Sequence, residues 1–310
     1  MKYSLSKYLK INQLRLICAI AEHGQLGLAA NEIAITQPAA SRMLSEIEST
    51  MQAKLFERHP KGMVLTLIGQ RVAQRAHNML VELRDMSRDV DEMQRGERGI
   101  VSVGAVTGAA VGFVVPAIRQ LKATSPKTVV NVNVDTSDVL VHDLIIGNND
   151  FVLARLLSQF DTNDFEVCPA KSEKVKLLVR EDHPMANAKE VSLKDLTAYE
   201  WVIQSQRAPM SEAVNNAFLN SGLRPPESIT NTTSLLVMMS ILISSSAIAP
   251  LASEVSELLV EKLGARLRVL RLKEPVEMSP YFLIQIKGRQ LSPAAERLRA
   301  LVLQGLKQAK

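Results

Sequence analysis

The segment Leu28–Glu48, LAANEIAITQPAASRMLSEIE, holds two helix-like stretches that lie only a few residues apart in the chain. Ile35, Thr36 and Gln37 connect them, and Pro38 follows at once. Proline fits the first turn of a helix, where its missing N–H would have no helical partner in any case. The second stretch therefore begins near Pro38, and its first turn consists of residues that are small, polar or basic.

The apolar positions of this second stretch define its buried face. Ala40, Leu44 and Ile47, followed by Met51, recur at intervals of 4, 3 and 4 residues, which is the spacing of one side of a helix. A helix braced by the one before it is the helix-turn-helix pattern, whose second helix reads base edges in the major groove with its N-terminal residues. An αα-hairpin within an all-helical core would show the same spacing and remains the alternative.

Two earlier helices are predicted in front of this one. The first begins at Asn12, which is suited to an N-cap, and ends at Gly24, which is suited to the left-handed conformation after a helix. The second covers about residues 26–34, where Ala29 and Ala30 allow the next helix to approach closely. The three helices together form a compact N-terminal module.

A short two-stranded wing is predicted directly after the helices, in AKLFERHPKGMVLT (residues 53–66). Pro60 and Gly62 indicate a turn between the two strands. Arg58 and Lys61 lie at this turn and would contact phosphates or a minor groove beside the second helix of the pair. His59 could add a contact or could simply be exposed.

The charge of the chain agrees with a polyanionic partner for this first part only. The chain of 310 residues has a formal net charge of +5. Residues 1–80 contain 10 Lys or Arg and 5 Asp or Glu, so 10 − 5 = +5, and the other 230 residues balance 27 against 27. A solvated basic surface would give the same numbers, so the charge alone does not identify DNA as the partner.

The N-terminal motifs resemble those of LysR-type transcriptional regulators. The matching features occur in the order of the family: the pair Ala29-Ala30, the run Thr36–Arg42, Glu48, the run Leu55–Arg58 and Leu65-Thr66 with Gly69. The chain departs from the family pattern at two helix junctions, with Thr50-Met51 and with Leu67-Ile68. The resemblance implies a sequence-specific DNA-binding regulator of transcription. The residues expected to face DNA are Thr36, Gln37, Pro38, Ser41, Arg42, Arg58 and Lys61.

A long helix that connects two domains and mediates dimerisation is predicted from Gly69 to residue 95. Its apolar residues recur at alternating intervals of 4 and 3, which is a heptad pattern and favours a two-stranded coiled coil. The seam consists of Val72, Ala76, Met79, Leu83, Met86 and Val90. A single amphipathic helix that packs on its own domain is the alternative. The resemblance also implies a linker helix, and tetramers built from such dimers.

The region after Gly99 alternates strand-like and helix-like runs, which predicts a mainly parallel α/β sheet with helices on both faces. The resemblance implies two periplasmic-binding-protein-like subdomains, with crossings near residues 168–171 and 271–277. We therefore expect a winged helix-turn-helix over residues 1–68, a linker helix over 69–95 and an effector-binding domain over 96–310. Within that domain, subdomain I covers about 99–168 and 275–310, and subdomain II about 169–274.

Polar residues at strand ends mark the expected effector site, because ligands of such sheets lie where strands end and helices begin. The candidates are Thr107, Gln204, Ser205, Thr232 and Ser234. Each of them could instead be a helix cap. Arg155 could anchor a charged ligand, or it could be solvated or ion-paired. The expected effector is a small molecule such as a sugar or an organic acid. NNDFVLAR (residues 148–155) is similar to the branch of the family related to regulators of sugar-binding-protein genes.

Other functions have little support in the sequence. VGAVTGAAVGF (residues 103–113) is glycine-rich but matches neither phosphate-binding motif. The five histidines and two cysteines show no metal-binding spacing, no nucleophile elbow is present, and no stretch is apolar enough to span a bilayer. We therefore expect no enzyme, no metal and no cofactor. The expected protein is cytoplasmic and bacterial, and it binds double-stranded DNA, itself, an effector and RNA polymerase. A small-molecule receptor or carrier whose N-terminal helices serve oligomerisation is the alternative.

Overall fold

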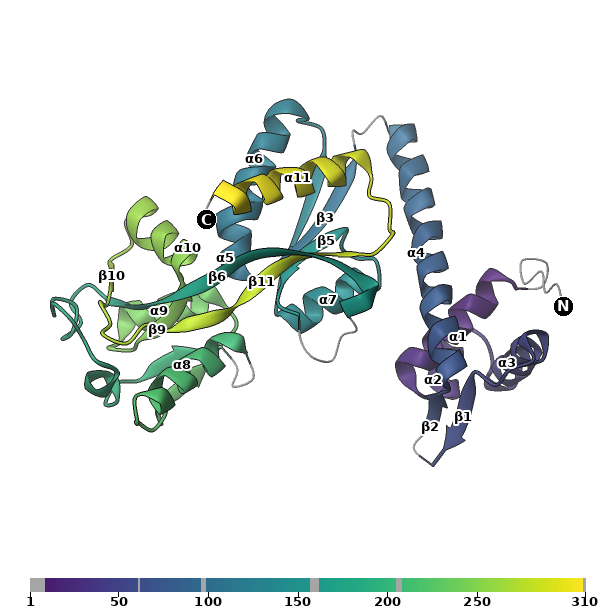
Figure 1. The fold of residues 1–310 in the computed structure, drawn as a ribbon, viewed down its shortest axis with the longest axis horizontal. Coiled ribbons are helices and arrows are strands. Elements are labelled where there is room, and N and C mark those ends of the chain that lie inside the picture. The colour runs from purple at the N-terminus through teal and green to yellow at the C-terminus, as the bar shows by residue number, and fades with distance from the viewer. Residues whose placement is uncertain (1–8, 61, 96–98, 157–161, 205–207, 309–310) are drawn as a thin grey trace. The chain divides into compact units, whose positions relative to one another are not determined.

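The computed structural model describes residues 9–60, 62–95, 99–156, 162–204 and 208–308, and it divides into two compact units, residues 1–96 and 97–310 (Figure 1). Each unit has its own hydrophobic core. Within the described residues, no helix is both long enough and apolar enough to cross a membrane.

The N-terminal unit contains the predicted helix-turn-helix with its wing. Its elements are α1 (Ile11–His23), α2 (Leu26–Glu32), α3 (Gln37–Met51), β1 (Phe56–His59), β2 (Gly62–Leu65) and α4 (Leu67–Arg95). The strands β1 and β2 pair antiparallel, so the two-stranded wing is confirmed. The core gathers residues of all three short helices with Leu55, Phe56, Ala73 and Ala76.

Three helix boundaries in this unit differ from the sequence prediction. The N-cap of α1 is Lys10, not Asn12, and the side chain of Gln13 folds back onto the backbone N–H of Lys10 at 2.9 Å. The helix α2 ends at Glu32 because Ala34 adopts a left-handed backbone with φ of 56°. The helix α4 begins at Leu67, two residues before the predicted start.

The C-terminal unit is an α/β domain in two halves. The first half contains β3 (Ile100–Ala105), a helical segment formed by α5 (Thr107–Ala109), η2 (Ala110–Val114) and α6 (Val115–Thr124), then β4 (Val129–Val134), α7 (Ser137–Ile145), β5 (Phe151–Ala154), η3 (Thr162–Asp164) and the C-terminal α11 (Pro293–Gln308). The second half contains η4 (Leu193–Leu196), β7 (Trp201–Ile203), α8 (Pro209–Asn220), β8 (Ile229–Asn231), α9 (Leu235–Ser244), β9 (Ala249–Ala252), α10 (Ser253–Glu257), η5 (Leu258–Lys262) and β10 (Leu267–Val269).

Two long strands belong to both halves. The strands β6 (Phe165–Arg180) and β11 (Glu277–Ile286) run side by side through the unit (Figure 1). The strand β6 pairs with β11 as far as Lys174 and with β9 from Val175 onwards. The change of partner therefore falls a few residues after the predicted crossing at 168–171.

The main sheet is mixed, which corrects the prediction of a mainly parallel sheet. Its strand order is β10-β6-β11-β5-β3-β4, with β9 also paired to β6. The strand β3 is parallel to β4 and β5, whereas β6 and β11 are antiparallel to each of their neighbours. An alternating strand–helix pattern predicts the parallel part correctly, but it cannot reveal the two strands that cross between the halves.

Candidate DNA-binding surface and effector cavity

The helix α3 presents its first turn to solvent. Thr36 is the N-cap, and its side-chain oxygen accepts a hydrogen bond from the backbone N–H of Ala39 at 3.4 Å. Pro38 lies in the first turn as predicted. Because Ala40, Leu44 and Ile47 are buried on the opposite face, this helix has one face in the core and one face free to meet a partner.

The predicted DNA-facing residues of α3 lie on that free face. Gln37, Pro38 and Arg42 are exposed and Ser41 is half-buried. The hydroxyl of Thr36 is used by its own helix, so its role in the structure is to cap α3. A groove of about 620 Å³ lies beside this face, and its walls include Gln37, Ser41 and Arg58.

The wing is held in place by a contact with the end of α1. The backbone N–H of Met63 donates to the carbonyl oxygen of Gly24 at 2.6 Å. A Cβ atom on Gly62 would lie 2.2 Å from the same oxygen, and Gly62 has a φ of 136°, so only glycine fits there. Arg58 is exposed on the wing. Lys61, the other predicted contact at the tip, lies outside the described residues.

The junction from α3 to the wing depends on a buried carboxylate. Glu48 accepts hydrogen bonds from the backbone N–H groups of Leu55 at 2.9 Å and Phe56 at 3.3 Å, and it pairs with Lys54 at 2.6 Å. Burial alone would raise the pKa of Glu48, but the hydrogen bonds from Lys54, Leu55 and Phe56 outweigh burial, and the net pKa is lowered. Glu48 is therefore held ionised as a structural link.

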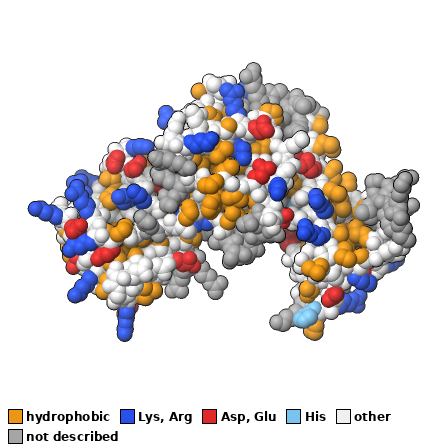
Figure 2. Space-filling view, in the orientation of Figure 1, with side chains coloured by type: hydrophobic (Ala, Val, Ile, Leu, Met, Phe, Trp, Pro, Cys, Tyr) orange, Lys and Arg blue, Asp and Glu red, His pale blue; other side chains and the backbone are white. Residues whose placement is uncertain are grey.

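The predicted dimerisation seam on α4 divides into two parts. Val72 and Ala76 pack against the core of their own unit, where Ala76 is fully buried and Val72 is half-buried. Further along, Met79, Met86 and Val90 are 54%, 58% and 49% exposed, and Leu83 is half-buried. Apolar side chains are visible along this helix in Figure 2. A partner helix would cover this second part.

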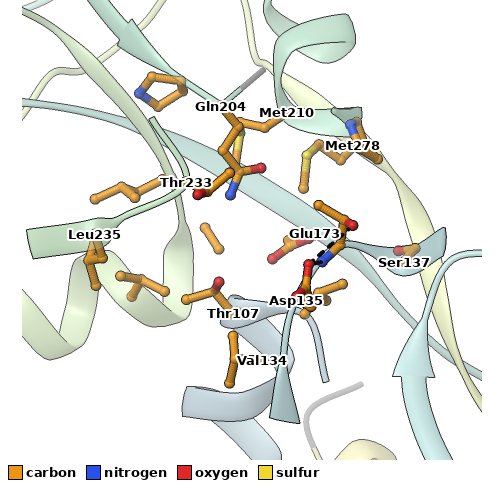
Figure 3. A pocket seen from close by; sticks show the side chains of 18 of the residues that line it. Thr107, Val134, Asp135, Ser137, Glu173, Gln204, Met210, Thr233, Leu235 and Met278 are labelled. Carbon is orange, nitrogen blue, oxygen red and sulfur yellow. Dashed lines mark hydrogen bonds between the residues drawn. The ribbon is translucent and has the colours of Figure 1, made fainter. Parts of the chain in front are cut away.

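The effector site was expected where strands end and helices begin, and a cavity of about 240 Å³ lies there between the two halves of the C-terminal unit (Figure 3). Two of the candidate effector residues, Thr107 and Gln204, line it. Ser205 lies outside the described residues. Thr232 and Ser234 are not among the lining residues: the Ser234 hydroxyl caps α9 by accepting from Val237 N at 3.3 Å, and the Thr232 hydroxyl accepts from Ser234 N at 3.1 Å.

Several lining residues were missed by the sequence analysis. Thr233 lies between the candidates Thr232 and Ser234, Asp135 comes from the link between β4 and α7, and Ser137 is the first residue of α7. That link was open to the same strand-end rule, because TVVNVNVD (residues 128–135) reads as a strand followed by a polar turn. Glu173 gave no local signal, because it lies on the crossing strand β6 and enters the cavity only through the fold.

An ion pair between Arg155 and Glu173 lies in the wall of the cavity (Figure 3). The Arg155 guanidinium also donates from Nε to the carbonyl oxygen of Ser279 at 3.0 Å, and both charged side chains are buried. Burial raises the pKa of Glu173, and the positive charge of Arg155 offsets part of this effect. Arg155 is therefore buried and ion-paired within the cavity wall, and it is not solvated.

Comparison with known proteins gives two family matches and a set of relatives. Residues 11–70 match "Bacterial regulatory helix-turn-helix protein, lysR family", and residues 94–307 match "LysR substrate binding domain". The HTH-type transcriptional regulator GbpR of Rhizobium radiobacter is 39% identical over 249 residues, which cover 80% of this chain and 82% of the relative. A regulator of the same name from Azospirillum brasilense is 28% identical over 292 residues, which cover 94% and 85%. The sequence-based branch assignment agrees with these two relatives.

Solved structures share the fold along nearly the whole chain. Full-length CbnR in complex with its target DNA matches with a TM-score of 0.55 at 21% identity, over 96% of this chain and 100% of that one. A full-length variant of OxyR from Pseudomonas aeruginosa matches with a TM-score of 0.59 at 17% identity, over 96% and 95%. The receptor or carrier interpretation has no support among these matches.

Proposed function

Because this chain belongs to the LysR family of transcriptional regulators, we propose that its N-terminal unit binds an operator and that a small molecule in the C-terminal cavity controls that binding. The protein is a sequence-specific DNA-binding transcriptional regulator. Its relatives in the comparison are regulators of transcription, and we assign it no catalytic activity. A protein that acts on DNA in this way belongs in the cytoplasm.

The helix α3 is the proposed recognition helix. Gln37, Ser41 and Arg42 lie on its free face and would read base edges from the major groove, which is about 12 Å wide. Pro38 shapes the first turn. Arg58, and Lys61 at the wing tip, would bind phosphates or the neighbouring minor groove.

A homodimer formed through α4 would place two recognition helices on successive half-sites. The exposed Met79, Met86 and Val90 and the half-buried Leu83 support this proposal, because water-exposed apolar residues at heptad spacing favour a partner helix. Pairs of dimers would form the tetramer implied by the family resemblance. RNA polymerase is the proposed partner through which operator binding changes transcription.

The effector would bind in the cavity between the two halves of the C-terminal unit. The cavity combines apolar walls, such as Leu235 and Met238, with polar side chains from Thr107, Gln204 and Thr233, which is the usual character of a small-molecule site. An effector changes DNA binding only if it has different affinities for two arrangements of the protein.

One observation supports the DNA-binding proposal most strongly. Gln37, Pro38 and Arg42 on α3 are exposed to solvent, while the opposite face of the helix is buried. Footprinting of the full-length protein on the DNA flanking its own gene tests it. We expect protection of a partly palindromic site and a strong loss of affinity as salt is raised, since phosphate contacts release counterions. Binding that is indifferent to both sequence and salt would contradict the proposal.

A further inference from the structure

The charges in the wall of the effector cavity limit what the cavity can bind; this inference rests on the proposed effector site. Among the described lining residues, the ionisable side chains are Asp135, Glu173 and Arg155. The guanidinium of Arg155 is already engaged by Glu173 and by the carbonyl oxygen of Ser279. The described wall therefore carries more negative than positive charge, and its cation is occupied.

Two carboxylates of the chain lie beside the beginnings of helices at the cavity. A helix N-terminus favours an anion, and an anionic ligand would need such a place. The carboxylate of Glu173 lies against the first turn of the helical segment Thr107–Thr124, since a Cβ on Gly108 would be 2.1 Å from its Oε1. Asp135 precedes α7 and accepts from the backbone N–H of Thr136 at 2.7 Å.

At the other two helices that begin at the cavity, one donor of the first turn is missing or already used. The helix α8 begins with Pro209, which has no N–H to donate. In α9 the hydroxyl of Ser234 accepts from Val237 N. A ligand carboxylate would thus meet a protein carboxylate at two of these helix ends and the hydroxyl cap of Ser234 at a third.

Neutral hydrogen-bonding groups remain available to a ligand. Thr107, Gln204 and Thr233 line the cavity from both halves of the unit and make no side-chain hydrogen bond to another described residue. Their hydroxyl and amide groups can both donate and accept. The carboxylates of Asp135 and Glu173 can accept from ligand hydroxyl groups. Figure 3 shows these side chains arranged around one space.

The volume of the cavity limits the ligand further. At about 240 Å³ it is smaller than the roughly 300–1,000 Å³ typical of sites for drug-sized molecules. We infer that the effector is a polyhydroxylated molecule of about monosaccharide size that carries no negative charge, and that Glu173 sets this selectivity against anions by engaging Arg155. Asp135 contributes to the same selectivity from the edge of the cavity.

Calorimetric titration of the full-length protein with matched sugars tests the inference. The panel consists of the common aldopentoses and aldohexoses with their uronates and aldonates, so that members of a set differ mainly in negative charge. We expect at least one neutral sugar to bind roughly tenfold or more tightly than its anionic counterparts, a difference set by electrostatic repulsion. Equal or tighter binding of the uronate or aldonate, or no binding by any neutral sugar, would overturn the inference.

Variants of the cavity carboxylates make the test specific. Glu173→Gln releases Arg155 and should narrow the preference for the neutral sugar over its uronate by roughly tenfold. Asp135→Asn changes an exposed residue and should shift the preference in the same direction without a risk to folding. The control is Asp138→Asn, an exposed acid in the first turn of α7 that does not line the cavity. An unchanged preference in both Glu173→Gln and Asp135→Asn, or an equal shift in Asp138→Asn, would contradict the assigned role.

Failure of this inference can be told apart from failure of the proposed effector site. Gln204→Leu removes an amide from the cavity wall and should weaken any ligand that binds there. If an organic acid binds the protein and Gln204→Leu weakens it, the effector site stands and the neutral class is wrong. If a neutral sugar binds and Gln204→Leu has no effect, the site is misplaced. Arg207 lies outside the described residues, so its variant is measured as well. If the protein prefers uronates and Arg207→Gln abolishes that preference, the inference is also overturned.

Discussion

The carboxylate of Glu48 accepts a hydrogen bond from the backbone N–H of Leu55 at 2.9 Å, and this bond joins the last turns of the recognition helix to the segment that opens the wing. The same carboxylate binds Phe56 N and Lys54 Nζ. Two backbone donors and one cation thus converge on one buried acceptor. The position of the wing relative to α3 depends on this acceptor staying ionised.

Replacing Glu48 by Gln should destabilise the N-terminal unit by about 1–3 kcal/mol, because a buried, charge-assisted set of hydrogen bonds is weakened. Hydrogen exchange of the Leu55 and Phe56 amides in the full-length protein is the measurement. Both amides should exchange faster in Glu48→Gln. In Glu46→Gln, which changes an exposed acid of the same helix, they should keep the wild-type rate.

The contribution of Glu48 should also depend on pH. Its folded-state pKa is lowered below 4.5 by its hydrogen-bond partners, so the stability it provides is fully present above pH 4.5 and is lost as the pH falls through the lower folded value. The exchange rates of wild type and Glu48→Gln should therefore converge below that pH, once rates are corrected for intrinsic exchange. A difference that persists undiminished in acid would show that charge is not the cause.

Replacing Arg42 by Ala should weaken binding to the specific operator by about 1–3 kcal/mol if its guanidinium reads a base. Replacing Arg58 by Ala should instead weaken binding to all duplexes alike and reduce the salt slope by about one. Fluorescence anisotropy with operator and scrambled duplexes at several salt concentrations separates the two effects. If Arg42→Ala weakened both duplexes equally, the arginine would be a phosphate contact and not a base contact.

Replacing Leu83 by Asp should dissociate the dimer, because it places a charge in the exposed part of the α4 seam. Sedimentation velocity should show a smaller species for Leu83→Asp and an unchanged assembly for Leu83→Met, which keeps an apolar side chain. Val72→Asp is expected to destabilise the unit itself, since Val72 packs on its core. An assembly that survives Leu83→Asp intact would place the interface elsewhere.

His183 should make the C-terminal unit less stable in mild acid. Met185 N donates to its Nδ1 at 3.0 Å, and its Nε2 lies 3.2 Å from the carbonyl oxygen of Ser246, so the ring accepts at one nitrogen and donates at the other. Burial lowers the pKa of His183, and the hydrogen bond to Ser246 only partly opposes this. Protonation would break the bond from Met185, so the stability is present above pH 6.5 and is lost as the pH falls below it.

Trp201 is the chain's one tryptophan and is fully buried in the C-terminal unit, so its fluorescence reports unfolding of that unit. Urea unfolding should show a loss of stability between about pH 7.5 and 5.5 for wild type, a range that brackets the usual histidine pKa. The loss should be smaller for His183→Asn, whose side-chain oxygen can still accept from Met185 but does not titrate. His142→Asn, at an exposed histidine of α7, should behave like wild type. An undiminished pH effect in His183→Asn would exclude this histidine as its source.

The N-terminal unit could be predicted from sequence because its determinants are local. The 3–4 spacing of Ala40, Leu44 and Ile47, the proline at the start of α3 and the turn at Pro60 each act over a few residues. The errors were equally local. Lys10 caps α1 in place of Asn12, because Gln13 satisfies the backbone N–H of Lys10 and allows the helix to begin one residue before Asn12.

The cavity was only half predicted because it is assembled from distant segments. Thr107 and Gln204 follow strands, and the strand-end rule finds them. Arg155 and Glu173 are 18 residues apart in sequence, and no periodicity reveals that β6 carries Glu173 across both halves. The alternation of strands and helices likewise gave no sign that β6 and β11 run antiparallel to their neighbours. Such features depend on contacts that are long-range in the chain.

The sixteen residues of β6 also restrict how the C-terminal unit can move. The strands β6 and β11 run without a break through both halves of the unit. Sliding of one half past the other would therefore break the backbone hydrogen bonds between these strands, whereas a twist about the two strands would keep those bonds. The register of β11 against β6 shifts between Met278 and Tyr281, and strands bend at such irregularities. At that bend, the carbonyl oxygen of Ser279 accepts a hydrogen bond from Arg155 Nε. Arg155, which pairs with Glu173 in the cavity wall, therefore also holds the strand about which the two halves would turn.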